Sequence, residues 1–370
     1  MPKKLSLPTA IFILAFSFFL SACSSNSGPV NPSGNSGIIA AGSTFIYPIM
    51  SRWISSFQSD HKGVQINYQS IGSGGGIQQL KKGLIDFGAS DAALDDAQLK
   101  EMPQPIIQIP ESAGPVCITY NLPELKAPLK LSASTLAGIF LGNIKNWQDP
   151  AIKKDNPGVK LPNHAVLVAH RSDGSGTTNI FTTYLAKVSP EWDKKVGKGI
   201  AVSWPTGVGG KGSEGVTGIV HQSEGAIGYT ELNYAKENNL PVALVRNQAG
   251  EWITPSAAGT TAAIDASHDE LDKDVRTPIV DPPASAKDAY PICGLTYLLV
   301  PKGGQNVSKR QDVKEFIEYI ITGGQSSASS LFYAQLPQTL VEQDQKLLGE
   351  MTADGKPLPE GTDQANLGTK

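Results

Sequence analysis

Short apolar runs alternate with amphipathic helical stretches from residue 38 onward, and this alternation constrains the fold more than any other feature. The run "GIIAAG" predicts a strand, and "TFIYPIMSRWISSFQSD" after it places six large apolar side chains on one helical face. "GVQINYQSIG" then alternates like a strand, and "GGGIQQLKKGLI" predicts the next helix. Such alternation indicates an α/β architecture, in which ligands bind at the carboxyl ends of strands.

The same pattern continues to the end of the chain. "DFGASDAAL" predicts a buried strand, "LSASTLAGIFLGNIKNWQD" a helix entered through Ser132 or Ser134, and "AVLVAHRSDGSGTTNIFTTYLAKV" a strand, a loop and a helix. From Tyr290 an apolar strand precedes the helical stretch "DVKEFIEYIITGG". A chain of 370 residues is long for a single core, so we expect two lobes.

The N-terminus has the composition of a secretory signal. Lys3 and Lys4 precede the apolar core "AIFILAFSFFL", which is shorter than the roughly 20 residues of a membrane span. The core ends in "LSAC", which resembles the lipobox of bacterial lipoproteins and makes Cys23 the lipidated residue; ordinary secretion with an incidental Cys23 is the alternative. We therefore expect a lipoprotein signal peptide over residues 1–22, a flexible tether over 23–37, and a lipid-anchored domain outside the cytoplasmic membrane.

Charge and metal-ligand spacing exclude several classes of function. The formal net charge is −3, it becomes two units more negative without Lys3 and Lys4, and no basic patch indicates nucleic-acid binding. The five histidines are scattered without metal-binding spacing, so we expect neither a metal nor a cofactor. Cys117 and Cys293 lie in strand-like runs, which leaves open a disulfide bridge or two buried thiols.

Three predicted strand-to-helix junctions combine glycines with hydroxyl side chains. They are "AAGSTFIYPI" at residues 40–49, "SIGSGGGIQQL" at 70–80 and "RSDGSGTTNIF" at 171–181. A helix N-terminus presents unpaired N–H groups and the positive end of the helix dipole, and glycine permits close approach of an anion. Each turn alone is explained by ordinary helix capping. Three of them in one chain favour a convergent oxyanion site.

Arg171 is the clearest candidate ligand in these turns. Its planar donors suit a tetrahedral oxyanion, and Asp173 could orient it, although the two could equally form a surface ion pair of little energy. We interpret the neighbouring His170 as a packing residue or as one that supports the ligand-binding residues from behind. "GVGGKGS" lacks the hydroxyl residue that a P-loop needs after Gly-Lys, and "DGSGT" lacks the nucleophile-elbow pattern, so neither indicates an enzyme.

The three turns, in this order, resemble those of the periplasmic phosphate-binding proteins of bacterial ABC phosphate uptake systems. The resemblance covers nearly the whole chain after the tether, including "LAGIFLGNIKNW", "GVGGKGSEGV" and "GAIGY". It implies a type II-like periplasmic binding protein fold: two α/β lobes of mixed sheets flanked by helices, with hinge strands between them. We expect lobe 1 over residues 38–118 and 290–355, lobe 2 over 119–289, and a loose tail over 356–370.

The family's site residues carry over by motif. The phosphate contacts implied by the resemblance are Thr44, Phe45, Ser73, Asp91, Arg171, Ser175, Gly176 and Thr177, with Asp173 orienting the arginine. The implied function is high-affinity binding of inorganic phosphate and its delivery to an ABC permease, by a monomer that is not an enzyme and that meets the membrane only through its lipid anchor.

Asp91 has the strongest physical rationale of these residues. A carboxylate in an anion site is repelled by the ligand unless the ligand carries a proton to donate. Phosphate keeps an O–H at neutral pH and sulfate does not, so an acceptor at this position selects against sulfate. Taken alone, Asp91 could instead cap a helix over "AALDDAQL". Receptors for arsenate, sulfate or molybdate, and a serine phosphatase, are the alternatives; Asp91 opposes sulfate and molybdate, and the turns lack a general base for the phosphatase.

Overall fold

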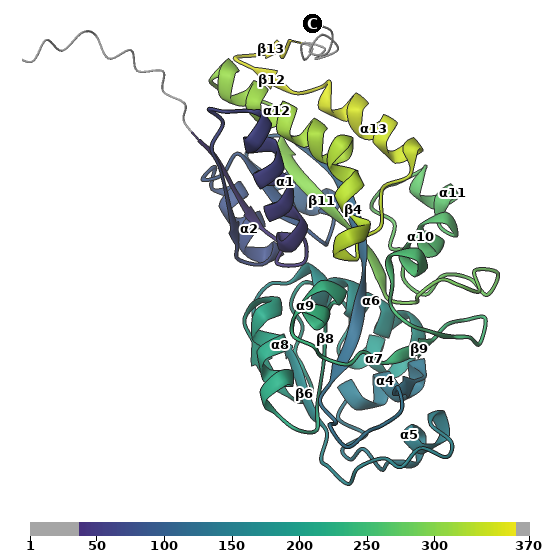
Figure 1. The fold of residues 1–370 in the computed structure, drawn as a ribbon. Helices are drawn as coiled ribbons and strands as arrows, with labels where there is room; N and C mark the ends of the chain where they lie inside the picture. The colour runs from purple at the N-terminus through teal and green to yellow at the C-terminus, as the bar shows by residue number, and fades with distance from the viewer. Residues whose placement is uncertain (1–36, 360–370) are drawn as a thin grey trace, which may run out of the picture. The chain divides into compact units, whose positions relative to one another are not determined.

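One eight-stranded sheet forms the centre of the protein (Figure 1). The computed structural model describes residues 37–359, and the predicted signal peptide, Cys23 and nearly all of the predicted tether lie outside the described residues. Across the sheet the strands are β2 (Ile66–Ser70), β1 (Ile38–Gly42), β3 (Phe87–Ser90), β11 (Cys293–Pro301), β4 (Ile106–Tyr120), β8 (Ala226–Glu231), β6 (Leu167–Arg171) and β7 (Val208–Gly210).

Strand β4 belongs to both halves of this sheet. Its residues 106–115 pair antiparallel with β11, and Val116–Tyr120 pair antiparallel with β8. We call the half with β1, β2, β3 and β11 lobe 1, and the half with β6, β7 and β8 lobe 2. The two-lobed mixed α/β fold expected from the sequence is confirmed, whereas the residue limits of the lobes stay predictions. A strand shared by two lobes is the connection expected of a hinge.

Parallel strands form the outer part of each half. β1 pairs in parallel with β2 and β3, and β6 pairs in parallel with β7 and β8. The helices that follow or cover these strands are α1 (Tyr47–Asp60), α2 (Ser73–Lys81), α3 (Asp96–Lys100), α4 (Ala133–Phe140), α5 (Pro150–Asp155), α6 (Gly176–Val188), α7 (Pro190–Lys195), α8 (Gly212–Gln222), α9 (Leu232–Glu237), α10 (Ala257–Asp265), α11 (His268–Leu271), α12 (Val307–Ile321) and α13 (Gln338–Leu348). As the sequence predicts, the glycine–hydroxyl turns lie where parallel strands end and helices begin.

Smaller elements complete the described chain. A three-stranded sheet is formed by β10 (Trp252–Ile253), β9 (Leu244–Arg246) and β5 (Lys130–Leu131), and a hairpin by β12 (Thr352–Ala353) and β13 (Lys356–Pro357). The hairpin corrects the predicted loose tail, because its second strand begins at residue 356 and Leu358 after it is buried.

Two helices differ from their predicted limits for local reasons. The helix predicted from Leu131 through Asp149 ends at Phe140, because Gly142 adopts a φ of 73° that a helix cannot continue. The C-terminal helix begins at Val307, five residues before the predicted start, because the Asn306 side chain accepts a hydrogen bond from the Lys309 N–H and caps the first turn.

Cys117 and Cys293 are both buried free thiols, so the bridge that the sequence left open is not formed. On the antiparallel pair, Cys293 lies opposite Pro115 rather than Cys117. The Cys117 thiol donates to the Thr230 carbonyl at 3.2 Å, and the Cys293 thiol donates to the Tyr290 carbonyl at 3.2 Å. Burial raises the pKa of Cys293 to about 12 and that of Cys117 well above its usual range, so neither thiol is reactive at neutral pH.

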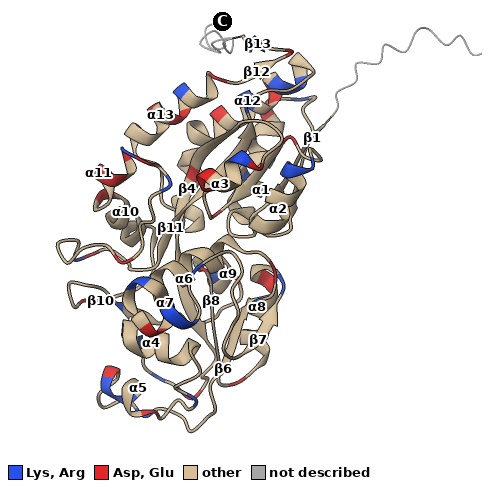
Figure 2. Cartoon of the chain, turned by 180° about the vertical axis from the view of Figure 1, so that it is seen from behind, with Lys and Arg blue, Asp and Glu red and all other residues tan. Residues whose placement is uncertain are grey.

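Charged residues are interspersed rather than segregated. Figure 2 shows basic and acidic positions mixed over the helices and loops of that face. Any anion specificity therefore has to come from local geometry, as the negative net charge already indicates. Within residues 37–359, no helix is both long and apolar enough to span a bilayer.

Asp344 on α13 is a buried carboxyl whose two oxygens accept no hydrogen bond from the described residues. Burial raises its pKa from 3.8 to about 8. The folded state therefore binds a proton more tightly than the unfolded chain, and stability falls as the pH rises from about 4 to about 8. We expect Asp344→Asn to raise the free energy of unfolding by about 1–3 kcal/mol at pH 7 and to change it little at pH 4.

Chemical denaturation of wild type and Asp344→Asn at pH 4, 6 and 8 measures this difference. Glu342→Gln is the matched control, because Glu342 is an exposed carboxylate on the same helix. An Asp344→Asn effect that is independent of pH would contradict the linkage.

Candidate functional site

Three segments of lobe 1 meet at the carboxyl ends of β1, β2 and β3. Ser43 and Thr44 follow β1, Gly72 and Ser73 follow β2, and Asp91 follows β3. Because β2, β1 and β3 are neighbours in the sheet, these turns lie side by side. The Ser43 hydroxyl donates a short hydrogen bond to Asp91 Oδ1, and the Ser73 hydroxyl lies 3.4 Å from Asp91 Oδ2.

Two segments of lobe 2 face them. β6 ends at Arg171 and leads into α6 at Gly176, and β7 ends at Gly210 and leads into α8 at Gly212. These strands are parallel neighbours, so the two helices begin at the same edge of the sheet. The site therefore combines helix N-termini from both lobes, as expected for an anion site in an open α/β sheet.

Helix capping distinguishes these N-termini from ordinary ones. The helices α1 and α2 have Ile46 and Gly72 at the N-cap, and neither has a side-chain cap bond. Their first N–H groups are therefore not satisfied by a side-chain cap, although the Gly74 N–H of α2 donates to the Gly174 carbonyl of lobe 2. Ser175 does cap α6, accepting from the Thr178 N–H at 3.1 Å, but its hydroxyl proton can still be donated to a ligand. Capping and ligand binding are thus compatible at Ser175.

Arg171 and Asp173 form a two-bond ion pair in the site. Arg171 Nε donates to Asp173 Oδ1 at 2.8 Å, and Arg171 Nη2 donates to Asp173 Oδ2 at 2.6 Å. Burial opposes the charge of Arg171, but the bonds to Asp173 outweigh it and raise the pKa of the guanidinium. Arg171 is only 4% exposed, so this pair is not the surface ion pair that the sequence left as an alternative. With two donors held by Asp173, the remaining N–H groups of Arg171 are oriented for other acceptors.

Asp91 is held at a pKa close to neutrality. Burial, together with the negative charge of Glu231, raises its pKa from 3.8 to about 7, against the opposing effects of Ser43, Arg171 and Ser73. Its side chain does not cap α3, because the N-cap of that helix is Asp95. The capping role that the sequence alone allowed for Asp91 is therefore wrong, and the carboxyl is left in the site.

The two lobes touch each other through these same turns. The Gly74 N–H donates to the Gly174 carbonyl at 2.9 Å, the Gly176 N–H donates to Ser73 Oγ at 3.1 Å, and the hydroxyl oxygens of Thr44 and Ser213 are 2.8 Å apart. Gly72 has a φ of 82°, and a Cβ there would clash with Asp173 Oδ2 and with the Gly174 carbonyl oxygen. The structure is therefore a closed form in which glycines permit backbone from both lobes to approach.

Gly176 makes the closest of these approaches to Asp91. A Cβ at Gly176 would lie 2.5 Å from both Cβ and Oδ2 of Asp91, although alanine suits the first turn of a helix. We expect Gly176→Ala to oppose lobe closure and to weaken ligand binding by about 1–3 kcal/mol, roughly five- to 150-fold, while the protein stays folded. Isothermal titration of phosphate checks this.

Gly218→Ala is the matched control for Gly176→Ala. Gly218 lies on α8, and a Cβ there meets no atom within 4 Å. Equal affinities for the two variants would show that the contact between α6 and Asp91 does not limit closure.

The predicted site residues form one cluster, but the side chains of two of them, Phe45 and Thr177, contact other residues. The Phe45 ring is buried against Tyr333, 5.9 Å between centroids, so only the Phe45 backbone is available to a ligand. The Thr177 hydroxyl donates to Glu231 Oε1 at 2.6 Å, so its proton already has an acceptor. His170 stacks on Trp204, with ring centroids 4.9 Å apart, in agreement with the packing role assigned to it.

Three residues of the cluster were missed by the sequence reasoning. Ser43 contacts Asp91 and lies inside a motif that the sequence did single out. Ser213 contacts Thr44 and lies 3.4 Å from Arg171 Nη1; its turn "GGKGSEG" has the same glycine–hydroxyl composition as the other three and could have been found from it. Glu231 is the buried last residue of β8, and only its position directly after an apolar run could have pointed to it.

Comparison with known proteins gives the family. A model of the PBP superfamily domain matches residues 28–323. The phosphate-binding protein PstS of Xylella fastidiosa is 43% identical over 307 residues, covering 83% of this chain and 83% of that protein. PstS of Methanocaldococcus jannaschii is 41% identical over 324 residues, covering 81% and 82%.

A solved structure shares the fold. A high-affinity periplasmic phosphate-binding protein, PfluDING, bound with phosphate, superposes with a TM-score of 0.65 at 22% identity, over 83% of this chain and 92% of that chain. With a PBP model matched over most of the chain and curated relatives above 40% identity, the chain belongs to the PstS family of phosphate-binding proteins within the PBP superfamily.

Proposed function

We propose that this protein binds inorganic phosphate with high affinity outside the cytoplasmic membrane and delivers it to an ABC permease. The family supports phosphate as the ligand, since the curated relatives are named phosphate-binding proteins. The observation that carries the proposal is the buried Asp91 carboxyl beside Arg171 and the N-termini of α2 and α6. An acceptor among so many donors fits an oxyanion that still carries a proton.

The proposed contacts divide between the lobes. Lobe 1 supplies Ser73, Asp91 and the turn with Thr44 and Phe45, and lobe 2 supplies Arg171 and the turn from Ser175 through Thr177. Arg171 brings the positive charge, the hydroxyl and backbone N–H groups donate, and Asp91 accepts the ligand proton. Asp173 fixes the arginine by its two hydrogen bonds. Closure of the lobes then removes the anion from water and strengthens each of these bonds.

A panel of anions tests this proposal. Phosphate, arsenate, sulfate and molybdate are added separately to phosphate-free protein, and thermal unfolding is followed. A ligand that binds only the folded state adds about 2.7 kcal/mol of stability at 100 times its Kd. We expect phosphate and arsenate to raise Tm and the two unprotonated anions to have no effect. A rise in Tm with sulfate and none with phosphate would mean that sulfate is the ligand.

The pKa of Asp91 gives this selectivity a pH dependence. Below about pH 7 the carboxyl is protonated and becomes a donor, which sulfate accepts; above it the carboxylate repels sulfate. We expect the sulfate affinity of the wild type to rise by about tenfold for each pH unit as the pH falls toward 7, and to level off below about pH 7, because the carboxyl is then already protonated. Sulfate titrations at pH 6, 8 and 9 measure this, and a flat profile would contradict the assigned pKa.

The lipid anchor and the permease are further parts of the proposal. The lipobox before Cys23 supports acylation of that cysteine, and mass spectrometry of the membrane-associated protein tests it. Cys23→Ser is expected to release the protein in soluble form. A serine phosphatase is the remaining alternative, and release of product from a chromogenic phosphate ester by the purified protein would support it over the binding function.

A further inference from the structure

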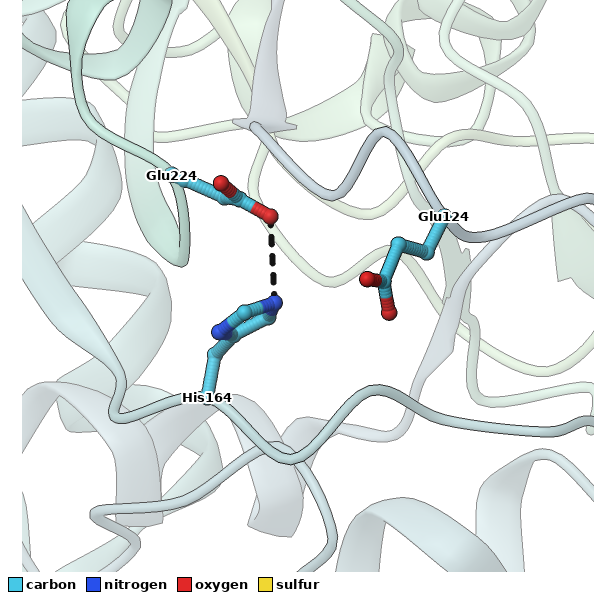
Figure 3. Close-up of side chains that lie close together, drawn as sticks. All are labelled: Glu124, His164 and Glu224. Atoms are coloured by element: carbon cyan, nitrogen blue, oxygen red, sulfur yellow. Dashed lines mark ion pairs between the residues drawn. The ribbon is translucent and has the colours of Figure 1, made fainter.

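Three potential metal ligands converge at the other end of lobe 2. Glu124, His164 and Glu224 each offer one ligand atom, and these atoms lie within 4.8 Å of one another. Figure 3 shows the three side chains pointing toward a common point from three different segments of the chain. His164 Nε2 is 3.1 Å from Glu224 Oε1. The atom is shielded from solvent, yet no group among residues 37–359 meets it with hydrogen-bond geometry, so it is free to bind an ion.

Backbone hydrogen bonds hold these segments together. The segment with Glu124 begins at Asn121, whose N–H donates to the Ala226 carbonyl at 2.9 Å and whose carbonyl accepts from the Gly225 N–H at 2.8 Å. Gly225, next to Glu224, accepts from Trp147 Nε1 at 2.9 Å, and the Trp147 N–H donates to the His164 carbonyl at 3.0 Å. The three ligand-bearing segments are therefore fixed to one another before any ion binds.

Gly225 is needed for this arrangement. Its φ is 81°, and a Cβ there would lie 2.6 Å from the Ala165 carbonyl oxygen and 3.4 Å from the His164 Cβ. Only glycine adopts this conformation without strain and lets the chain before β8 approach the His164 segment so closely. The proximity of Glu224 to His164 thus follows from the backbone and is independent of an ion pair between them.

We propose that Glu124, His164 and Glu224 form a binding site for a divalent transition-metal ion, with Zn²⁺ as the ion that fits this donor set. One imidazole nitrogen and two carboxylates are ordinary zinc ligands, and three protein ligands leave one tetrahedral position for water. Two carboxylates offset the charge of the ion. Mg²⁺ and Ca²⁺ prefer oxygen ligands alone, so a histidine at the centre disfavours them.

The metal site is separate from the anion site. Glu224 and His164 precede β8 and β6, whereas Glu231 and Arg171 end the same two strands. β6 contains five residues and β8 contains six, which at about 3.3 Å per residue separates the two sites by roughly 16–20 Å. Zinc and phosphate therefore bind independently, and the proposal does not rest on the proposed function.

Isothermal titration of ZnCl₂ into the untagged protein in phosphate-free buffer tests the site. We expect one zinc ion per chain, loss of this binding in His164→Ala, and at least about tenfold weaker binding in Glu124→Gln and in Glu224→Gln. MgCl₂ should give no binding at the same concentrations. Glu124 is exposed, so Glu124→Gln should fold as the wild type does. This variant therefore still tests the site if His164→Ala does not fold.

His268→Ala is the matched control, because His268 forms an exposed pair with Asp272 at 3.5 Å in the described structure. It should retain the zinc binding of the wild type. The proposal is overturned if the wild type binds no zinc, if His268→Ala loses it as His164→Ala does, or if Glu124→Gln binds zinc as tightly as the wild type.

Discussion

Arg171→Ala is expected to weaken phosphate binding by about 2–5 kcal/mol, roughly 30- to 5000-fold. The guanidinium supplies the positive charge that acts on Asp91 in the site, and it is 4% exposed, so water screens it little. The truncation also leaves Asp173 without the two hydrogen bonds that hold down its pKa. A carboxylate without its counter-ion, held by the Gly212 N–H at 3.0 Å, then faces the anion, which adds repulsion to the lost attraction.

Isothermal titration of phosphate into the wild type and Arg171→Ala measures this loss. Arg246→Ala is the matched control, because Arg246 is an exposed arginine of lobe 2 that lies over the Trp252 ring. Arg171→Lys should recover only part of the affinity, since lysine keeps the charge and loses the planar pair of donors. An Arg171→Ala variant with the affinity of the wild type would mean that Arg171 does not contact the ligand.

Asp91→Asn is expected to change selectivity more than affinity. An amide oxygen still accepts the phosphate proton, whereas the amide N–H₂ can donate to sulfate and no charge repels it. A carboxyl with a pKa of about 7 is still about one-tenth protonated at pH 8, so we expect the phosphate-to-sulfate affinity ratio to fall by about tenfold at pH 8 and by about tenfold more for each pH unit above it. Phosphate affinity itself should fall less than sulfate affinity rises.

Competition of sulfate with phosphate in the two proteins gives this ratio. Asp95→Asn is the control from the same segment, because asparagine caps α3 as well as aspartate does. An unchanged phosphate-to-sulfate affinity ratio in Asp91→Asn would mean that Asp91 does not discriminate between the two anions.

The sequence predicts the parts of the site that are local. A helix N-terminus after a parallel strand can be recognised from a few residues, and so the turns at Gly42, Gly72 and Gly174 were assigned correctly to strand-to-helix junctions. The ion pair between Arg171 and Asp173 could also be predicted, because the two residues are two positions apart.

Contacts between distant segments could not be predicted in the same way. Ser213 is 169 residues from Thr44, and Glu231 is 54 residues from Thr177, so no local pattern pairs them. The separation of Cys117 from Cys293 likewise depends on the register of β4 against β11. That register cannot be predicted from either strand sequence alone. The metal cluster was missed for the same reason, since His164 meets Glu124 and Glu224 only through the backbone around Gly225.

The most direct test of the account is a titration of the wild type with phosphate and with sulfate at pH 8, where Asp91 is ionised. We predict one phosphate bound per chain, undiminished by a large excess of sulfate, and no heat from sulfate alone. Sulfate binding comparable to phosphate binding, or the absence of phosphate binding, would contradict the account.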